Sequence, residues 1–398
     1  MKLDNTQNKK IKVLFRHRSM EMGGVEKVLL SMLNNLDRNK FDISLCLNLN
    51  QGELRNTIPS FIPTTILARG KEDFPKNKIL NKLCLIVRGL KLALYRKFPF
   101  IVDRFILKNE ADIEIATGYT MFSDVLNSSN KKSKKIGWFH SDITFPKLQP
   151  IVPQLLNQIP QFDYFIFGSQ QAKDIMIKTY PKVQLPPHQV ILNAIPMEEL
   201  KEKAKTFSPD FETTSPIFVS VGRLHSRKGH HKLLEAHAKL LKDGFLHQVI
   251  VIGDGEERET LTQRIHQLGV QSSFLLLGAL LNPYPYIKNA DFFIMPSESE
   301  GWPLVIADAL ILQKPIISTQ VGGIPEMITH KKNGFLTQYD TQSLYEAMKE
   351  FLTNQSLISH IQENLKESEK QFDNQKIFQS VERILIELAT KKHYESSL

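Results

Sequence analysis

Short apolar runs alternate with amphipathic stretches along the whole chain of 398 residues. A helix is expected after the first run, where apolar residues recur at spacings of three and four. The first half predicts strands at residues 11–16, 42–49, 64–68, 112–116, 135–139 and 163–167. The second half predicts strands at 217–221, 248–252, 273–277, 291–295 and 315–318, and helices at 228–242, 256–268, 303–312, 341–353 and 374–389.

Strands that are separated by helices favour parallel sheets with right-handed crossovers. The chain is too long for one ordinary core and suits two α/β domains. Residues 197–215 are polar, with Ser-Pro pairs at residues 208–209 and 215–216, which is typical of an interdomain linker. We therefore predict two Rossmann-like parallel-sheet domains, one over residues 1–200 and the other beginning at residue 201.

The net charge of +9 is unevenly distributed. Residues 1–200 hold 29 Lys and Arg against 18 Asp and Glu, and the remaining residues hold 22 against 24, so the halves carry +11 and −2. Cys46 and Cys84 each lie in an apolar run, which favours buried free thiols in a reducing cytosol. No run approaches the ~18–20 apolar residues of a membrane span, and the first apolar run is too short for a signal peptide.

The second half carries an ordered set of short motifs. They are Val221-Gly222-Arg223-Leu224 with Lys228-Gly229, Ile252-Gly253-Asp254-Gly255, Leu277-Gly278, residues 296–304, Asp308-Ala309-Leu310, Lys314-Pro315-Ile316-Ile317, residues 321–326 and Asn333-Gly334. In order and spacing the set resembles the retaining GT-B glycosyltransferases of family 4, also called glycosyl transferases group 1. The first half matches this family only at Gly23-Gly24-Val25-Glu26 and around His140.

This resemblance implies two domains that face each other across a cleft. Residues 1–200 would bind the acceptor, and residues 201–373 would bind the nucleotide sugar. The C-terminal helix within residues 374–398 would pack back on the first domain. The activity implied is the transfer of a hexose from a nucleoside diphosphate sugar, with retention, to a glycan or lipid-linked acceptor in surface polysaccharide or glycolipid synthesis. UDP is the nucleotide expected from its frequency in the family.

Transfer from a nucleotide sugar expels a diphosphate, whose growing negative charge must be stabilised. The chain contains no Asp-x-Asp metal motif, so we expect no metal and no other cofactor. Arg223 and Lys228 follow a predicted strand, at the edge where open α/β sheets bind ligands. With Gly222 beside them, we predict that these cations bind the diphosphate. The alternative is a pair of solvated surface cations.

Gly301-Trp302-Pro303-Leu304 precedes a predicted helix, whose free N–H groups suit an anion. The resemblance implies that Glu300 contacts the hydroxyls of the donor sugar and that Asp308 contacts the ribose. The family usually has Glu at the second position, so direct contact of the shorter Asp308 with ribose stays open. Glu298 competes with Glu300, and Asp308 has the alternative of a solvent-facing helix residue.

Two places in the first half are candidates as well. Gly23 and Gly24 lead into the first helix, and the resemblance brings this loop to the diphosphate and the acceptor. His140 follows a predicted strand, where family members often place a His near the transferred sugar, and Asp142 is a candidate to orient it. His17 is similarly placed and carries less weight. The alternatives are an ordinary glycine turn and a structural histidine.

Residues 71–108 carry ten Lys or Arg and three acidic residues, interleaved with apolar residues. This pattern is typical of an interfacial helix on anionic lipid. It fits equally a surface helix that packs on its own domain. We expect a cytoplasmic protein, with peripheral attachment to the inner face of the cell membrane as a hypothesis. No nucleic-acid module is recognisable, so no nucleic acid is expected as a partner.

Three other functions fit parts of the pattern less well. A nucleotide-sugar 2-epimerase shares the fold but needs further carboxylates and histidines near the sugar. A non-catalytic sugar-binding scaffold subunit has no need of Arg223, Lys228 and Glu300 together. A dehydrogenase is disfavoured, because the G-x-G-x-x-G pattern that begins at Gly253 has Arg258 in its last position.

Overall fold

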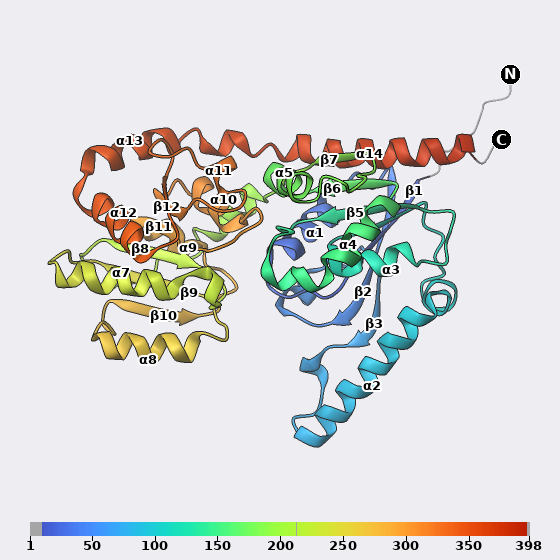
Figure 1. Cartoon of the computed structure of the whole chain (residues 1–398), viewed down its shortest axis with the longest axis horizontal. Helices are drawn as coiled ribbons and strands as arrows, with labels where there is room; N and C mark the ends of the chain where they lie inside the picture. The colour runs from blue at the N-terminus through green and yellow to red at the C-terminus, as the bar shows by residue number, and fades with distance from the viewer. Residues whose placement is uncertain (1–9, 212, 396–398) are drawn as a thin grey trace. The chain divides into compact units, whose positions relative to one another are not determined.

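The computed structural model describes residues 10–211 and 213–395. It divides the chain into two compact units, shown in Figure 1. Unit 1 runs to Ala194 and resumes at Asn374, and unit 2 spans Ile195–Asp373. Each unit is built on one parallel sheet, which confirms the predicted fold class.

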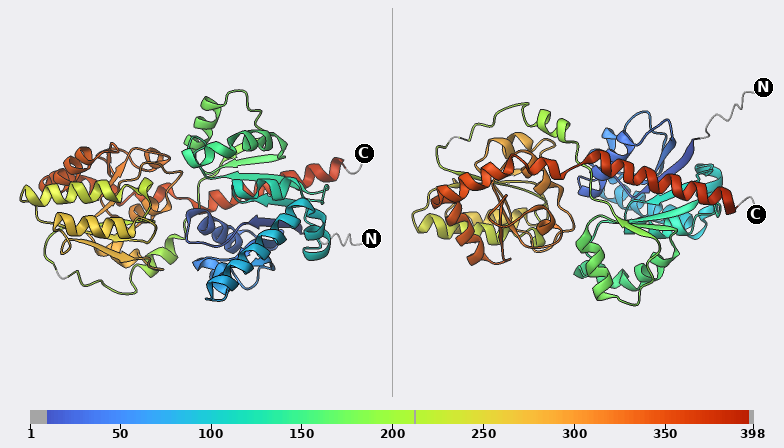
Figure 2. Two further views of the ribbon diagram at one scale, coloured as in Figure 1. Left: turned by 60° about the horizontal axis from the view of Figure 1, so that its bottom comes forward. Right: turned by 90° about the horizontal axis from the view of Figure 1, so that it is seen from above.

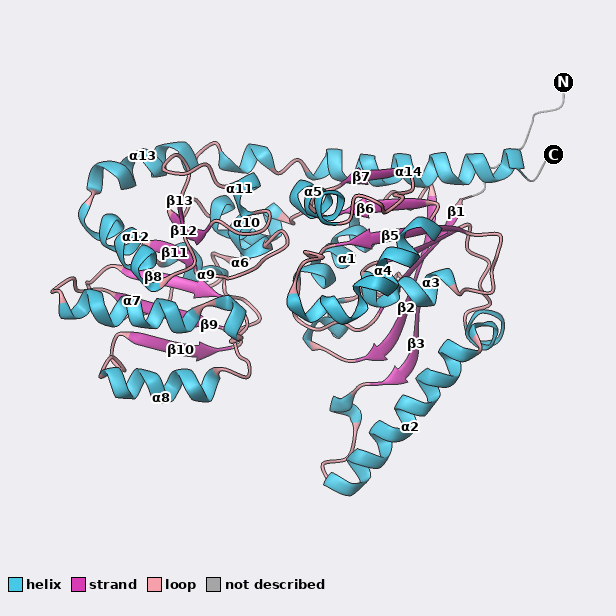
Figure 3. Cartoon of the chain, in the orientation of Figure 1, coloured by secondary structure: helices cyan, strands magenta, loops and turns pink. Residues whose placement is uncertain are grey.

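The sheet of unit 1 has seven strands in the order β3-β2-β1-β4-β5-β6-β7. Every neighbouring pair is parallel, as expected where helices form the crossovers (Figure 3). The strands are β1 Ile11–His17, β2 Phe41–Asn50, β3 Thr64–Arg69, β4 Ile113–Ala116, β5 Lys134–Phe139, β6 Tyr164–Phe167 and β7 His188–Val190. Most residues of the central strands β1, β4 and β5 are buried, because both faces of a parallel sheet are covered.

The helices of unit 1 are α1 Gly24–Asn35, α2 Lys78–Lys97, α3 Phe122–Leu126, α4 Val152–Gln158, α5 Gln170–Thr179 and α14 Asn374–Glu395. The last of these returns from the end of the chain and contacts β1, β4 and β5. Glu382 on α14 accepts a hydrogen bond from the Asp37 amide at 3.0 Å and pairs with Lys40 at 2.9 Å. Figure 2 shows the helix along unit 1 from two further sides.

Unit 2 has a six-stranded parallel sheet in the order β10-β9-β8-β11-β12-β13. The strands are β8 Ile217–Val221, β9 Gln248–Ile252, β10 Phe274–Gly278, β11 Phe292–Met295, β12 Ile316–Thr319 and β13 Phe335–Thr337. The helices are α6 Met197–Lys203, α7 His230–Lys242, α8 Arg258–Leu268, α9 Tyr284–Asn289, α10 Leu304–Ile311, α11 Ile324–Met327, α12 Thr341–Thr353 and α13 Gln355–Leu365.

The strand order reverses at one place in each sheet. In unit 1 the chain winds outward on either side of β1 and β4, and in unit 2 on either side of β8 and β11. The loops that leave these strands diverge over opposite faces of the sheet, and the crevice they open is where doubly wound folds bind ligands. The candidate site is therefore expected at the carboxyl ends of β8 and β11 in unit 2, and of β1 and β4 in unit 1.

The predicted linker at 197–215 is wrong in its first part. Met197–Lys203 form α6, whose Leu200 is buried, and the helix contacts α9 and α10 within unit 2. Its mixture of Lys and Glu consists of surface pairs such as Lys203 with Glu199. Two strands of three residues each, β7 and β13, were missed because a run of that length carries no readable periodicity.

Candidate functional site

Two loops of unit 2 carry most of the predicted site. One leaves β8 and contains Gly222, Arg223 and Lys228, and the other leaves β11 and leads through Glu300 into α10. Since β8 and β11 are adjacent parallel strands, their carboxyl ends meet at one edge of the sheet. The sheet order thus brings together two motifs that lie about 70 residues apart in the sequence.

Close backbone contacts hold these loops against each other. The Glu298 amide donates to the Arg227 carbonyl at 2.7 Å, and the Gly323 amide donates to the Gly301 carbonyl at 2.6 Å. Gly229 has φ +70°, and a Cβ there would lie 1.9 Å from the Pro296 carbonyl oxygen. Only glycine permits such a conformation and such an approach, so the loop after β11 is fixed between its neighbours.

The second close approach supports Glu300 from below. Gly322 has φ +60°, and a Cβ on it would lie 2.1 Å from the Glu300 carbonyl oxygen. The hydroxyl of Thr319, at the end of β12, donates to the Ser297 carbonyl at 2.5 Å. The peptide that carries Glu300 is therefore held by the loop after β12 as well as by the loop after β8.

Lys228 and Glu300 form an ion pair. Lys228 Nζ lies 2.5 Å from Glu300 Oε1, and the side chains are only 17% and 9% exposed. Lys228 ends a short 3-10 turn, Ser226–Lys228, just before α7. A cation and a carboxylate, both largely removed from water, thus lie in contact at the carboxyl end of the sheet. These are the charge types that bind a phosphate oxygen and a sugar hydroxyl.

Arg223 lies differently. Its side chain is 72% exposed, and its Nε is 3.7 Å from Glu256 Oε2. His225 Nε2 approaches the other oxygen of the same carboxylate at 3.4 Å. A surface hollow of about 500 Å³ is lined by Glu256 and its neighbours at the start of α8. The guanidinium is therefore accessible to a solvent-borne anion, whereas Lys228 is already partnered.

The entry to α10 offers backbone rather than side chains. Trp302, Pro303 and Leu304 are buried, and the Trp302 ring packs edge-on against Phe372 at 6.1 Å. Gly301 is half-buried, and Pro303 occupies the position just before the first helical residue. The amide groups at this helix start are thus the features that suit an anion. The Trp302 indole belongs to the packing of unit 2.

Asp308 lies in the middle of α10, whose other residues are apolar. It is 5% exposed, so the alternative of a solvent-facing residue is wrong. Carboxylates are rarely buried in this way unless a partner or a ligand compensates the lost hydration. The burial of Asp308 therefore fits a role in the site better than a role at the surface.

His230 was missed by the sequence analysis. It opens α7, is 3% exposed, and its Nε2 lies 3.4 Å from the Ser220 hydroxyl. The imidazole lies against Gly222, where an added Cβ would be 4.0 Å from the ring. Burial lowers the pKa of His230 to about 3, with the Lys228 charge adding to the effect. A neutral imidazole therefore lies beside Gly222 at the carboxyl end of β8. No motif in the sequence singles out His230.

In unit 1 the predicted residues also follow strand ends. Gly23 and Gly24 form the entry to α1. His140 follows β5, and its ring stacks on Trp138 at 5.4 Å. Burial, with a smaller contribution from the nearby His17, lowers the pKa of His140 to about 3. His140 is therefore neutral near pH 7, where its ring can offer hydrogen bonds but no charge.

His17 lies closer to His140 than its sequence context indicated. It ends β1, its Nδ1 is 2.6 Å from the Thr117 hydroxyl, and its Nε2 is 3.5 Å from Glu26. Parallel pairing of β1 with β4 and of β4 with β5 brings these strand ends side by side. The histidines are more than a hundred residues apart in the chain, so only the strand order could have found their proximity.

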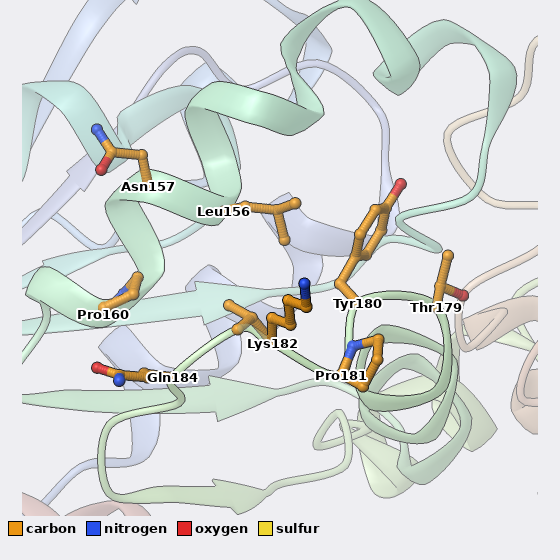
Figure 4. Close-up of a pocket in the computed structure, with 9 residues that line it drawn as sticks. Leu156, Asn157, Pro160, Thr179, Tyr180, Pro181, Lys182 and Gln184 are labelled. Atoms are coloured by element: carbon orange, nitrogen blue, oxygen red, sulfur yellow. The ribbon is translucent and has the colours of Figure 1, made fainter.

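Figure 4 shows a pocket of unit 1. Its volume is about 600 Å³. Two segments line it, residues 156–160 and 179–184, and none of the predicted site residues is among them. Within residues 10–211 and 213–395, no three His, Cys, Asp or Glu side chains are grouped so as to hold a metal ion.

Comparisons with known proteins find similarity in both the sequence and the fold. The family model described as glycosyl transferases group 1 matches residues 202–372, which is most of unit 2. This match covers less than half of the chain and lies in the unit where the motifs resemble the same family. A solved structure of HepE from Anabaena, in complex with UDP and glucose, superposes with a TM-score of 0.73 at 20% identity and covers 95% of this chain and 100% of its own.

Individual relatives can be named as well. The N-acetylgalactosamine-N,N'-diacetylbacillosaminyl-diphospho-undecaprenol 4-alpha-N-acetylgalactosaminyltransferase of Campylobacter jejuni is 28% identical over 384 residues. That match covers 92% of this chain and 97% of the relative. The lipopolysaccharide core biosynthesis glycosyltransferase LpsE of Rhizobium meliloti is 29% identical over 163 residues, which is 41% of this chain and 46% of LpsE. The similarity thus extends over nearly the whole chain in one case and over less than half in the other.

Proposed function

We propose that this protein transfers a hexose-type sugar from a nucleoside diphosphate sugar, with UDP as the nucleotide, to a lipid-linked glycan, with retention and without a metal. The observation that carries the proposal is the Lys228–Glu300 pair at the carboxyl ends of β8 and β11. The Campylobacter jejuni relative, whose name specifies a diphospho-undecaprenol acceptor, supports a lipid-linked acceptor. The HepE complex with UDP and glucose supports UDP.

In the proposed reaction the bond between the anomeric carbon and the β-phosphate oxygen breaks, and its electron pair leaves with the nucleoside diphosphate. An acceptor hydroxyl oxygen bonds to the anomeric carbon on the same face. Its proton passes to the departing phosphate oxygen. Lys228, Arg223 and the amides at the start of α10 stabilise the diphosphate. Glu300 and His140 bind sugar hydroxyls, Asp308 binds the ribose, and the Gly23-Gly24 and Gly222 backbones border the donor.

Lys228 and Glu300 change partners in this proposal. Without the donor each charge compensates the other, although both side chains are largely withdrawn from water. When the donor binds, the diphosphate takes the ammonium group and a sugar hydroxyl donates to the carboxylate. The residues are thus in place before binding, so little reorganisation is needed when charge develops on the leaving group.

The first test is a thermal-shift screen against nucleotide sugars, because a ligand that binds the folded state raises its apparent stability. A UDP-sugar should raise the Tm of the full chain more than ADP or GDP sugars do. Transfer is then measured as the UDP released in the presence of lipid-linked glycans. The anomeric configuration of the product is determined by proton NMR. An inverted product would overturn retention.

The same assay separates the alternatives. A 2-epimerase would convert the nucleotide sugar with no acceptor present, and a scaffold subunit would bind the nucleotide sugar and release no UDP. Activity that persists in excess EDTA is expected from a site that neutralises the diphosphate with protein cations. Loss of activity in EDTA, with recovery on adding Mg²⁺ or Mn²⁺, would contradict the metal-independent reaction.

A further inference from the structure

Helix α2 of unit 1 is exposed to an unusual degree. None of its 20 residues is buried. Ile79 is 80% exposed, Leu83 55%, Ile86 51% and Leu90 66%. Isolated apolar residues are common on protein surfaces, but a contiguous row of large aliphatic side chains marks an interaction surface.

One narrow face of α2 does contact its own unit. The half-buried positions 81, 84, 88, 92 and 95 recur at spacings of three and four. Leu92 and Tyr95 pack against a small buried cluster that includes Leu67 and Val102. Residues 79, 83, 86 and 90 recur at the same spacings on the opposite side of the helix. Helix α2 therefore packs on its own domain through one narrow face, as the alternative expected, while its outer apolar row stays exposed. In Figure 1 the helix flanks the edge strand β3 with its outer side uncovered.

The charge around this apolar row has a single sign. From residue 74 to residue 102 the chain has seven Lys or Arg and no Asp or Glu. On the helix itself, Lys82 and Lys91 fall on the two flanks of the outer row. When a helix lies with its apolar row in the headgroup–acyl interface of a bilayer, long cationic side chains in these positions can extend to the lipid headgroups.

The end of α2 is anchored to the sheet by a buried charge network. A π-helical segment, Ile101–Ile106, follows the helix and carries Asp103, which is 2% exposed. Arg16 on β1 donates to Asp103 Oδ1 at 2.5 Å, and the Ser129 amide donates to Oδ2 at 2.6 Å. The segment that follows α2 is thus tied to the core of unit 1.

From these observations we infer that the outer face of α2 (Ile79, Leu83, Ile86 and Leu90, with Lys82 and Lys91) docks unit 1 on a bilayer that contains anionic lipid. This rests on the proposed function, which places the acceptor on a lipid. Among the helices of residues 10–211 and 213–395, none has the length and hydropathy that a membrane span requires.

Charge decides between a bilayer and a second copy of the chain. Two copies of α2 packed face to face would bring together their cations with no acidic residue between residues 74 and 102 to neutralise them. An anionic bilayer attracts the same cations and accepts the same apolar side chains. An apolar row that is flanked by lysines therefore favours an anionic bilayer over a second copy of the chain.

The experiment is co-sedimentation of the full chain, without any donor, with vesicles of phosphatidylcholine containing 30% phosphatidylglycerol. Leu83→Glu with Leu90→Glu should lower the partition coefficient on the order of 100-fold. The matched control is Leu246→Glu with Leu281→Glu in unit 2, where these leucines are 70% and 76% exposed. Binding of the control should equal wild type. All four leucines are exposed, so the variants should keep the wild-type Tm.

A second pair of variants tests the charges. Lys82→Gln with Lys91→Gln should lower the partition coefficient by roughly 25-fold at low salt and by much less at 1 M salt. Lys239→Gln with Lys242→Gln on α7 makes the same change in charge in unit 2 and should have no effect.

Three results would overturn the docking surface. These are equal binding to neutral vesicles, equal loss in the unit 2 controls, and a self-association that Leu83→Glu with Leu90→Glu abolishes while no vesicle is bound. The proposed function fails separately. Vesicle binding without sugar transfer would refute the function and leave the surface intact. Full transfer to a water-soluble acceptor without vesicle binding would do the reverse.

Discussion

Replacing Lys228 by Ala removes one partner of the ion pair and leaves Glu300 largely buried without its cation. Breaking a fully buried pair in this way costs ~3–5 kcal/mol, and an exposed pair is worth ~0–1 kcal/mol. The side chains here are 17% and 9% exposed, which places the pair between these limits. We expect a loss of about 1–3 kcal/mol, which lowers Tm by roughly 2–10 °C for a domain of this size.

The effect on transfer should be larger than the effect on stability. Loss of one preorganised group that stabilises developing charge lowers kcat by ~10²–10³. Glu300→Gln keeps the shape of the side chain and removes its charge, and it should also reduce transfer by at least ~10²-fold. Both single variants should remain folded, because the backbone contacts of Gly229 and Gly322 do not depend on either side chain.

The double variant Lys228→Ala, Glu300→Gln separates folding from chemistry. It leaves no unpaired charge, so its Tm should be higher than that of Lys228→Ala, with a coupling of about 1 kcal/mol or more. Transfer should not recover. Tm is read by differential scanning calorimetry and kcat by UDP release, with Lys242→Ala on α7 as control. Lys228→Ala turnover within a few-fold of wild type would refute the proposed role, and so would recovery in the double variant.

Other variants test the support of the site and its response to pH. Gly322→Ala would place its Cβ 2.1 Å from the Glu300 carbonyl oxygen, so UDP release should fall at least 10-fold. Gly269 has a similar φ of +69° but nothing within 4 Å of an added Cβ. Gly269→Ala should therefore lower the free energy of unfolding by only about 1 kcal/mol and keep transfer. Equal activity of the two variants would contradict this. Burial lowers the pKa of His237 from 6.5 to about 3, so below pH 6.5 the unfolded chain binds a proton that the folded chain excludes. Stability should therefore fall as pH drops from 6.5 toward 3, by up to about 2 kcal/mol at pH 5 from this residue. Urea unfolding should show a shallower pH slope in His237→Gln, and an unchanged slope would contradict the assignment.

The fold of unit 2 was largely readable from its sequence, because its strands are short apolar runs and its motifs are local. Pro303 and the apolar residues after it predict the start of α10 to within one residue. The Thr341–Thr353 helix was predicted with its observed bounds. In these segments the periodicity, the flanking residues and the burial all agree.

The features that could not be predicted from the sequence depend on contacts between distant segments. Lys228 and Glu300 are 72 positions apart, and their contact follows from the pairing of β8 with β11. Trp302 lies in a motif that the family resemblance assigns to donor binding, and its ring packs on Phe372. A motif fixes which residue stands at a position, but the direction of its side chain is decided by packing that no local pattern encodes.

A site that neutralises a diphosphate without a metal holds its cations in place while no ligand is present. A cation that is largely withdrawn from water loses hydration, which an opposite charge in contact compensates. Glu300 provides that charge to Lys228 at 2.5 Å. Arg223 is exposed, so water hydrates its guanidinium. On the proposed function the two cations therefore act differently: Arg223 draws the diphosphate from solvent, and Lys228 is released to it when the sugar takes Glu300.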